Sequence, residues 1–382
     1  MPHDLELGAA RRLARPSLPG LERYLEEIGA VWESGTLSNF GAAAERFELG
    51  YAEYTGLANV RAVSSCDIGL TLALRALGLE AGARVLVPSF SFASTLHAVL
   101  WNGLRPHFVD VDPDTWCVTA DTCRAAATEP VHAIVGTHAF MAVCDLDGLE
   151  RLAAEAGAHL LFDAAQAFGT WVGDTHAGAF GDASVFSFSP TKIATCGEGG
   201  LAAFRDEAAA ARFELLRSYG SDGTYDSRFV GLNGKLSELH AALGCLTVPS
   251  VEEQVGARLD TCERYRERLG GLPGLRLQGA QPTVRNTPTQ FVVDLGDARP
   301  AVEAALAADG FDTRRYFRPL HAMDRFRAMP SEPLPVTERL GDALLALPLY
   351  TGLPDAEVER VCDVVESVLG ADQPPALQSF DG

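Results

Sequence analysis

Lysine is almost missing from this sequence. Only Lys192 and Lys235 occur among 31 basic residues, so arginine carries nearly all of the positive charge. Basic residues are in turn outnumbered by 51 acidic ones, which gives a formal net charge of −20. That charge argues against nucleic acid or an anionic membrane as the main partner, because both repel an acidic protein. An anionic small molecule is still compatible with a locally positive pocket.

Cysteine pairs and long apolar runs are missing too. None of the eight cysteines forms a C-x-x-C pair, and no Cys/His group has zinc-like spacing, so the sequence predicts no metal site. Scattered thiols of this kind are typical of reduced, cytosolic proteins. The stretch MPHDLELGAARRLARPS lacks the apolar centre of a secretion signal, and no run is long enough to span a bilayer. We therefore expect a soluble, cytoplasmic protein with no membrane partner.

Short apolar runs alternate with amphipathic segments in the first two-thirds of the chain. The runs are rich in β-branched and aromatic residues and are bounded by Pro, Gly or Asp, as strands are. They cover 83–90, 105–111, 131–138, 159–165 and 183–189. The segments between them, 67–79, 91–103 and 145–157, have the i, i+3, i+4 spacing of helices. This alternation predicts a mostly parallel sheet with helices on both faces, and ligands at the carboxyl ends of its strands.

The last third of the chain has a different pattern. A long helical stretch over 236–272 is interrupted by Pro249, which predicts a break or kink. A strand-like run at 289–295 and helical segments at 301–310 and 355–369 then suggest a smaller α+β unit. We expect a large domain over 1–250, with a helical segment at its N-terminus, and a small domain over 251–382. The tail from residue 370 is expected to be frayed.

Two charged residues follow neighbouring strand-like runs. Asp163 comes at the end of one run, and Lys192 comes just after another. An aspartate in such a place is often only a helix cap or turn former. Together, however, the two residues match the needs of pyridoxal phosphate (PLP): a lysine forms the Schiff base, and a carboxylate keeps the pyridine nitrogen protonated.

Other parts of the sequence could hold the rest of this cofactor. The stretch 64–70 opens a helix whose first amides could bind a phosphate, and Ser187 offers a hydroxyl. Phe90 and Phe92 offer aromatic faces for the ring. A serine before a helix is usually a cap, and a phenylalanine is usually core. The order of all these elements along the chain is what favours a cofactor site.

Residues from about 30 to 205 resemble the nucleotide-sugar aminotransferases, the DegT/StrS group of PLP enzymes of fold type I. The matching blocks are AVSSCDIGLTLALRALGL, VLVPSFSFASTLHAVLWNG, FVDVDPDTW, FDAAQAFG and SFSPTKIATCGEGG. A weaker match continues through 231–244 and 313–323. The resemblance implies an aspartate aminotransferase-like α/β fold, in which a mostly parallel central sheet with helices on both faces is followed by a smaller C-terminal α+β domain.

The resemblance also implies roles for residues around the cofactor ring. Lys192 would carry PLP as a Schiff base and then move the proton between the two carbons of the imine. Asp163 would pair with the pyridine nitrogen, and Gln166 would lie near the phenolic oxygen. Phe92 would pack against the ring. To act as a base, the released lysine needs a lowered pKa, because only the neutral amine accepts a proton.

The remaining implied roles concern the phosphate and the substrate. Ser187 and the amides of Cys66 and Asp67 would hold the phosphate. Asn233 would reach a phosphate in the neighbouring subunit's site, so the resemblance implies a homodimer with shared active sites. Residues implied to approach the sugar are Tyr316 and His321.

The chain departs from the family pattern at three places. Cys66 and Asp67 stand where the family often has Gly-Thr, and a carboxylate beside a phosphate is electrostatically unfavourable unless it turns away, for example to cap the helix. Lys235 replaces the usual arginine of an N-x-R-M block, and Met-Ala-Val over 141–143 replaces a G-N-P type of turn. These differences concern phosphate and substrate contacts, and leave the cofactor chemistry intact.

The resemblance implies transfer of an amino group from glutamate to a nucleoside-diphosphate-linked keto sugar. Pyridoxamine phosphate would be the intermediate and 2-oxoglutarate the by-product. We expect amination at C4 of a 4-keto-6-deoxyhexose, within amino-sugar biosynthesis such as natural-product glycosylation; the alternative is C3 of a 3-keto sugar. A sugar dehydratase of the same fold is disfavoured because such relatives replace the lysine with histidine. A non-catalytic regulatory protein is disfavoured because Asp163, Gln166, Ser187 and Lys192 are all present.

Overall fold

A seven-stranded sheet forms the centre of the molecule in the computed structural model, which describes residues 11–224 and 226–371. Its strand order is β1-β9-β8-β5-β4-β2-β3. Only β9 runs antiparallel to its neighbours, so the sheet is mostly parallel, as predicted. Its strands are β1 (Asn59–Val63), β2 (Arg84–Pro88), β3 (Arg105–Val109), β4 (Ala133–Thr137), β5 (His159–Asp163), β8 (Ala183–Ser187) and β9 (Gly200–Phe204).

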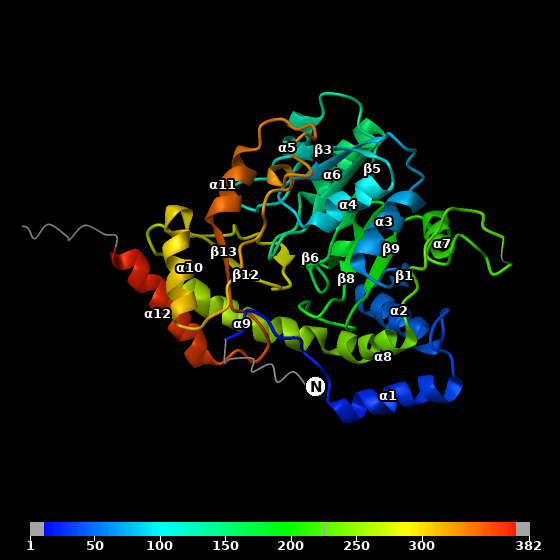
Figure 1. Ribbon diagram of the computed structural model, residues 1–382, viewed down its shortest axis with the longest axis horizontal. Coiled ribbons are helices and arrows are strands. Elements are labelled where there is room, and N and C mark those ends of the chain that lie inside the picture. Colours follow the sequence, from blue (N-terminus) through cyan, green and yellow to red (C-terminus); the bar gives the residue numbers. More distant parts are fainter. Residues whose placement is uncertain (1–10, 225, 372–382) are drawn as a thin grey trace, which may run out of the picture.

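Strand residues alternate between the two faces of this sheet, and helices cover both faces. In β2, Val85 and Val87 pack on one face while Leu86 packs on the other. The first face is covered by α3 (Cys66–Ala76), α4 (Ala93–Trp101) and α7 (Glu207–Leu216). The second face is covered by α5 (Ala120–Ala126), α6 (Leu146–Ala156), α2 (Ala42–Thr55) and α8 (Glu238–Thr247). Helix α1 (Leu21–Ser34) lies against α8 (Figure 1).

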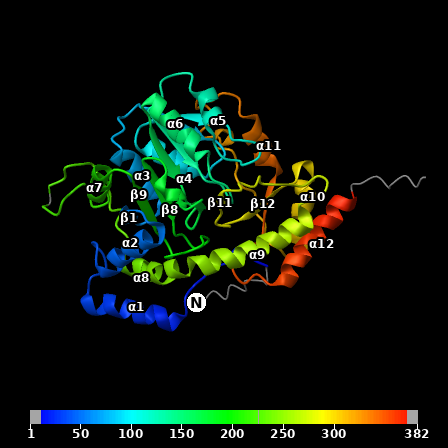
Figure 2. The ribbon, with the colours of Figure 1, turned by 180° about the vertical axis from the view of Figure 1, so that it is seen from behind.

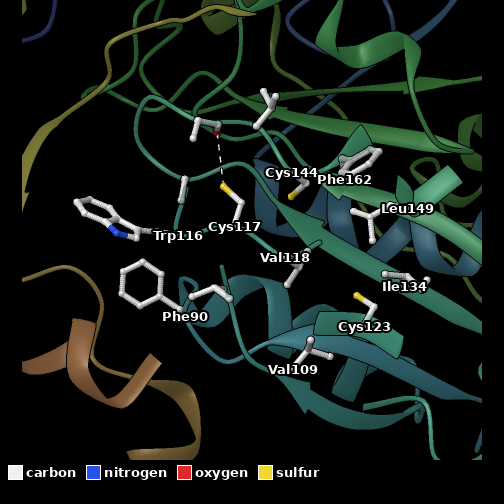
Figure 3. Packing of buried hydrophobic residues seen from close by; sticks show 14 of the residues in the cluster. Phe90, Val109, Trp116, Cys117, Val118, Cys123, Ile134, Cys144, Leu149 and Phe162 are labelled. Carbon is white, nitrogen blue, oxygen red and sulfur yellow. Dashed lines mark hydrogen bonds between the residues drawn. The ribbon is translucent and has the colours of Figure 1, made fainter. Parts of the chain in front are cut away.

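Figure 3 shows the packing on the second face beside α5 and α6. The rings of Phe90 and Trp116 lie at one end of this cluster, and the thiols of Cys117, Cys123 and Cys144 lie within it. The Cys117 thiol donates to the Ala142 carbonyl at 3.7 Å. All eight cysteines are free thiols, and burial raises the pKa of the Cys123 thiol to about 12. These cysteines therefore act as small apolar side chains of the core.

The long helical stretch breaks at Pro249, as predicted. A 3-10 turn, η2 (Val248–Ser250), separates α8 from α9 (Val251–Leu269). Figures 1 and 2 show α8 and α9 running one after the other along one side of the molecule, below the central sheet. Helix α12 (Asp355–Ala371) packs beside α9 and α10 (Arg299–Ala308).

Two small sheets complete the chain. One has the order β10-β12-β13 and carries the strand predicted at 289–295; its members are β10 (Arg276–Leu277), β12 (Phe291–Asp294) and β13 (Leu344–Leu347). The other joins β6 (Trp171–Val172), β7 (Thr175–His176) and β11 (Val284–Arg285). The remaining helical pieces are η1 (Ala177–Ala179), η3 (Gly296–Ala298), η4 (Leu320–Ala322) and α11 (Pro335–Ala343).

The first described residues lie beside the C-terminal part of the chain. The Arg11 amide donates to the Gly310 carbonyl at 2.9 Å, and the Leu349 amide donates to the Leu13 carbonyl at 2.9 Å. The division into domains at residue 250 stays a prediction. The N-terminal segment belongs to the first predicted domain but forms hydrogen bonds with residues of the second. Residues 1–10 of the stretch searched for a secretion signal, and 372–382 of the tail expected to fray, lie outside the described residues. Within 11–224 and 226–371, no helix is long and apolar enough to cross a membrane.

Candidate active site

A cavity of about 320 Å³ lies where β5 and β8 end and α3 and α4 begin. The carboxyl edge of a parallel sheet is the place where such folds bind ligands. The segment 314–317, from the C-terminal part of the chain, closes one side of it. Eight of the predicted site residues line this cavity: Lys192, Asp163, Gln166, Ser187, Cys66, Asp67, Phe92 and Tyr316.

Asp163 is the last residue of β5, and only 4% of it is exposed. Its Oδ2 accepts a hydrogen bond from the Thr95 hydroxyl at 2.6 Å, and its Oδ1 accepts one from the Ala165 amide at 3.2 Å. Burial raises the pKa of this carboxyl, while the two hydrogen bonds and Lys192 lower it. The Asp163 carboxylate is therefore a fixed, buried hydrogen-bond acceptor, and it favours the protonated form of a ring nitrogen that binds next to it.

Lys192 lies in the tight turn that follows β8. Its backbone amide donates to the Ser189 carbonyl at 3.1 Å, and the Cys196 amide donates back to the Phe188 carbonyl at 3.0 Å. Burial lowers the pKa of the ammonium group, while the nearby Cys66 and Asp163 raise it. Desolvation therefore moves this lysine toward the neutral amine that a proton carrier must be.

Glycines after Lys192 are required by the close packing of this turn. Gly197 has a φ of 83°, a left-handed conformation that side chains disfavour. A Cβ at Gly200 would lie 2.9 Å from the Cys66 amide nitrogen. The glycines thus let the start of α3 approach the end of β8, and bring the phosphate-binding candidates next to Lys192.

The first turn of α3 presents free amides to the cavity. Ser65 caps the helix, because its Oγ accepts from the Ile68 amide at 3.2 Å. The Cys66 and Asp67 amides precede the first helical hydrogen bond, which runs from the Gly69 amide to the Ser65 carbonyl. With the Ser187 hydroxyl, they form a set of donors suited to a phosphate.

The Asp67 carboxylate is not the cap of α3, since Ser65 has that role. Asp67 instead lines the cavity, and its negative charge raises the pKa of both Asp163 and Cys66. The suggestion that this carboxylate caps the helix is therefore wrong, because Ser65 is the N-cap and accepts from the Ile68 amide.

Gln166 and Phe92 border the cavity in the segments that follow β5 and β2. The Gln166 Oε1 accepts from the Phe140 amide at 2.6 Å, which fixes the side-chain amide. Phe92 precedes α4, lines the cavity and is 62% exposed. Phe90 packs in the core against Phe317 instead, so only Phe92 of the two candidate rings lines the cavity.

Asn233 and His321 lie outside the cavity lining. Asn233 is exposed and makes a backbone bridge with Ser218. The His321 Nδ1 lies 2.7 Å from the Ser89 hydroxyl, at the end of β2. Their implied roles stay predictions.

The structure adds residues that the sequence reasoning missed. His138 follows β4, stacks on Phe162 and lines the cavity; burial lowers its pKa to about 3, so it is a neutral imidazole. His138 follows the end of a strand, as Asp163 does, so the same sequence signal could have identified it. Thr95, Gln290 and Arg314 had no such signal, because they reach the site only through the fold.

The model of the DegT/DnrJ/EryC1/StrS aminotransferase family matches residues 21–366. The chain belongs to this family. The aminotransferase is 31% identical over 371 residues to the GDP-perosamine synthase of Caulobacter vibrioides, covering 94% of this chain and 98% of that protein.

Other relatives also match this aminotransferase over most of its length. The UDP-N-acetyl-3-dehydro-alpha-D-glucosamine 3-aminotransferase of Acidithiobacillus ferrooxidans is 33% identical and covers 92% of this chain and 95% of that one. A solved structure of DesI in the presence of its TDP-sugar product has a TM-score of 0.89 and 34% identity, covering 95% of this chain and 93% of that chain. These matches extend over nearly the whole length, so the α/β fold of PLP-dependent transferases is confirmed.

Pyridoxal phosphate is the cofactor of this aminotransferase, and the cavity fits it. A partly buried lysine, a buried aspartate and free helix-start amides lie around one space. Lys192 would bind the aldehyde carbon, Asp163 the ring nitrogen, and Ser187 with the α3 amides the phosphate. These residues supply a nucleophile, a counter-charge and an anion site, which are the groups that the cofactor requires.

Proposed function

We propose that this aminotransferase moves the amino group of glutamate to a keto carbon of a nucleoside-diphosphate-linked deoxy sugar. The observation that carries the proposal is that Lys192 and Asp163 line one cavity together with the free amides of α3. The names of the relatives support the acceptor class, since they include a GDP-sugar enzyme, a UDP-sugar enzyme and a protein with a TDP-sugar product.

Bound pyridoxal phosphate supplies an electron-poor ring that accepts the electron pair left when a neighbouring carbon loses its proton. Lys192 takes the proton from the α-carbon of the donor and delivers it to the adjacent position; in the second half of the cycle it moves a proton the opposite way. Its partial burial favours the neutral amine at the moment of proton uptake.

Other residues hold the reacting groups in place. Asp163, fixed by Thr95 and the Ala165 amide, keeps a proton on the ring nitrogen. Gln166 has its Oε1 engaged by the Phe140 amide, so its Nε2 is the group available to the phenolic oxygen. Phe92 lines the cavity and would pack against one face of the ring.

The acceptor carbon in this proposal is C4 of a 4-keto-6-deoxyhexose. Amination at C3 is the alternative, favoured by a relative whose name describes a 3-aminotransferase acting on a 3-dehydro sugar. In both cases the product is a nucleotide-linked amino sugar, which serves biosynthesis such as natural-product glycosylation. The proposed location of the reaction is the cytoplasm. Tyr316, which lines the cavity, and His321, which lies in η4 beside Ser89, would contact the sugar.

The proposed catalytic unit is a homodimer in which Asn233 contributes to the partner subunit's phosphate site. Asn233 lies in the segment between α7 and α8, where it is exposed and its backbone bridges to Ser218; part of this segment projects from the body of the molecule in Figures 1 and 2. Two apolar neighbours are exposed in the isolated chain, Val230 at 85% and Leu232 at 42%. An exposed amide flanked by exposed apolar side chains is suited to a protein interface.

The test is an incubation of the holoenzyme with glutamate and a panel of nucleotide-linked 3-keto and 4-keto sugars. We expect 2-oxoglutarate to appear only with a 4-keto-6-deoxy sugar, and the new amine to be found at C4. Amination at C3 would replace the proposed regiochemistry with the alternative. If the protein releases no 2-oxoglutarate with any sugar of the panel, the proposed function is wrong.

A further inference from the structure

A second cavity, of about 540 Å³, adjoins the cofactor cavity. We call it the vestibule. The two cavities share four lining residues, Thr191, Gln290, Arg314 and Tyr316. The outer wall of the vestibule comes from the N-terminal segment, residues 12–14, which hydrogen bonds to the C-terminal part hold in place. A ligand that reacts beside Lys192 can therefore extend into the vestibule past Arg314.

Arg314 is the basic side chain at the junction. Its guanidinium carbon lies 6.0 Å from the centre of the Tyr316 ring, and it makes no ion pair with any residue of 11–224 or 226–371. The adjacent Arg315 differs, because it is bound to the Glu303 carboxylate by three hydrogen bonds of 2.7 to 3.0 Å. Arg314 thus keeps its charge available at the cavity wall.

Gln290 gives a second, independent sign of a ligand at this junction. It is 9% exposed, and its Oε1 is buried without a hydrogen-bond partner among the described residues. Its Nε2 lies 3.5 Å from the Tyr316 hydroxyl. Buried amide oxygens are normally satisfied, so this acceptor is expected to receive a hydrogen bond from a bound molecule.

The chemistry of the first half-reaction identifies that molecule. The α-carboxylate of an amino donor is bonded to the same carbon that gives its proton to Lys192, so its counter-charge must line the same cavity. Among the described residues, Lys192 and Arg314 are the basic side chains that do so, since His138 is neutral. Lys192 has to give up its charge to accept the proton, which leaves Arg314 among the basic side chains that line the cavity from the same chain.

We infer that Arg314 binds the α-carboxylate of the amino donor, and that Arg12 in the vestibule binds the second carboxylate of a dicarboxylic donor. The inference rests on the proposed function and specifies its donor site. A guanidinium suits this role because it can pair with both oxygens of a carboxylate. The bound donor would also lie beside the unpaired Gln290 oxygen.

The experiment follows each half-reaction separately on the holoenzyme. The first mixes the enzyme with an amino acid and no sugar, and measures the loss of the aldehyde-form absorbance of the cofactor. The second starts from the amine form of the cofactor and adds the keto sugar. The variants are Arg314→Gln, Arg12→Gln and, as a matched control, Arg315→Gln. Cofactor content and thermal unfolding are measured for each of them.

Arg314→Gln is expected to raise the KM for glutamate, glutamine and alanine alike by at least about tenfold, because each donor has the α-carboxylate. Arg12→Gln is expected to raise the KM for glutamate only. The second half-reaction and the Arg315→Gln enzyme should match the wild type. These results would together support both assignments.

Other outcomes overturn the inference. If Arg314→Gln slows only the sugar half-reaction, Arg314 binds the diphosphate of the acceptor and the inference is wrong. If Arg314→Gln behaves like Arg315→Gln, the residue binds neither anion, while the proposed function stands. If Arg12→Gln leaves the KM for glutamate unchanged, the assignment of the second carboxylate is wrong. If no amino acid converts the wild-type cofactor, the proposed function fails as well.

Discussion

Lys192 and Asp163 share a cavity, and burial there shifts their pKa values in opposite directions. Burial lowers the pKa of the Lys192 ammonium and raises the pKa of the Asp163 carboxyl, so it disfavours the charged form of both. Each charge partly offsets that effect on the other. Burial of these two ionisable groups therefore lowers the stability of the fold unless a ligand interacts with them. Ionisable groups with shifted pKa values in a cavity are typical of active sites.

Replacement of the lysine tests the proton transfer directly. We expect Lys192→Ala to lower kcat by at least about a hundredfold, because a positioned acid–base group contributes roughly 10² to 10⁴ in rate. The measurement is 2-oxoglutarate release under saturating glutamate and sugar. Circular dichroism and thermal unfolding of the variant should match the wild type. A variant with normal turnover would contradict the assignment.

Asp163→Asn separates function from stability. Below pH 3.8, the ordinary pKa of aspartate, the carboxyl is protonated in the folded and the unfolded chain alike. As the pH rises, the unfolded chain ionises first, because the folded pKa is raised, so the cofactor-free protein loses stability up to that raised pKa. We expect the Asn variant without cofactor to resist urea better than wild type near neutral pH, with a gain that shrinks toward pH 3.8.

The same variant should lose activity on the order of a hundredfold or more, since it lacks the charge that holds the ring nitrogen protonated. Both readouts are needed. A variant that is less stable at every pH, or one that keeps normal turnover, would contradict the role given to Asp163.

Asp67 is the residue whose charge opposes the cofactor. It is the second residue of α3, and its carboxylate acts on the cavity where the phosphate is expected. We expect Asp67→Asn to tighten pyridoxal phosphate binding by about tenfold, because a like charge at close range is removed. Titration of the cofactor-free protein, followed by absorbance, gives the dissociation constant.

The chain offers a matched control for this experiment. Asp147 is likewise the second residue of a helix, α6, but it does not line the cavity. Asp147→Asn removes the same helix-start charge and should leave cofactor binding unchanged. Equal affinities for the wild type and Asp67→Asn would show that the carboxylate does not face the phosphate.

At the scale of elements, sequence periodicity found the strands that carry the site. All five predicted strands are present, because fully buried parallel strands are short, apolar and bounded by turn residues. Within the central sheet, strands β1 and β9 were not predicted. Strand β9 reads Gly-Leu-Ala-Ala-Phe, which has little β propensity, and it is a strand because it pairs with β8 and β1 on both sides.

The site itself was predictable only where its residues follow local patterns. Lys192, Asp163 and the start of α3 belong to contiguous motifs, whereas Gln290 and Arg314 lie 98 and 122 residues after Lys192 in the chain. No spacing rule links such distant positions. The fold brings them together when the segment around Tyr316 packs beside the carboxyl edge of the sheet.

Helix α2 depends on a residue from α8 at its N-terminus. The buried Glu238 accepts hydrogen bonds from the amides of Gly41 at 2.9 Å and Ala43 at 2.8 Å. We expect Glu238→Ala to lower the free energy of unfolding by about 3 kcal/mol, since it removes charge-assisted bonds to buried amides. Urea denaturation measures the change. The exposed Glu45, in the first turn of α2, gives the control: Glu45→Ala should change stability by no more than about 0.5 kcal/mol.

At the scale of the whole molecule, an acidic chain must bind anionic substrates. The formal net charge is −20, yet the residues at the cavity and the vestibule include Lys192, Arg314 and Arg12. The positive charge at the site is thus local, and it is built from parts that are distant in the chain. Residues 11–13 lie against the C-terminal part, so the first described residues and the sheet that contains β12 and β13 together form the wall of the vestibule.

The proposed dimer can be tested by mixing two inactive variants. Asn233→Asp would put a carboxylate beside the partner subunit's phosphate site, and we expect it to lower activity by roughly a hundredfold. Lys192→Ala inactivates the subunit that carries it. In a mixed dimer, the site with an intact Lys192 would receive its Asn233 from the other subunit. Random reassociation of equal amounts should therefore restore about a quarter of the wild-type activity. If Asn233 serves its own subunit's site instead, mixing restores nothing, because every site then lacks either the lysine or the asparagine.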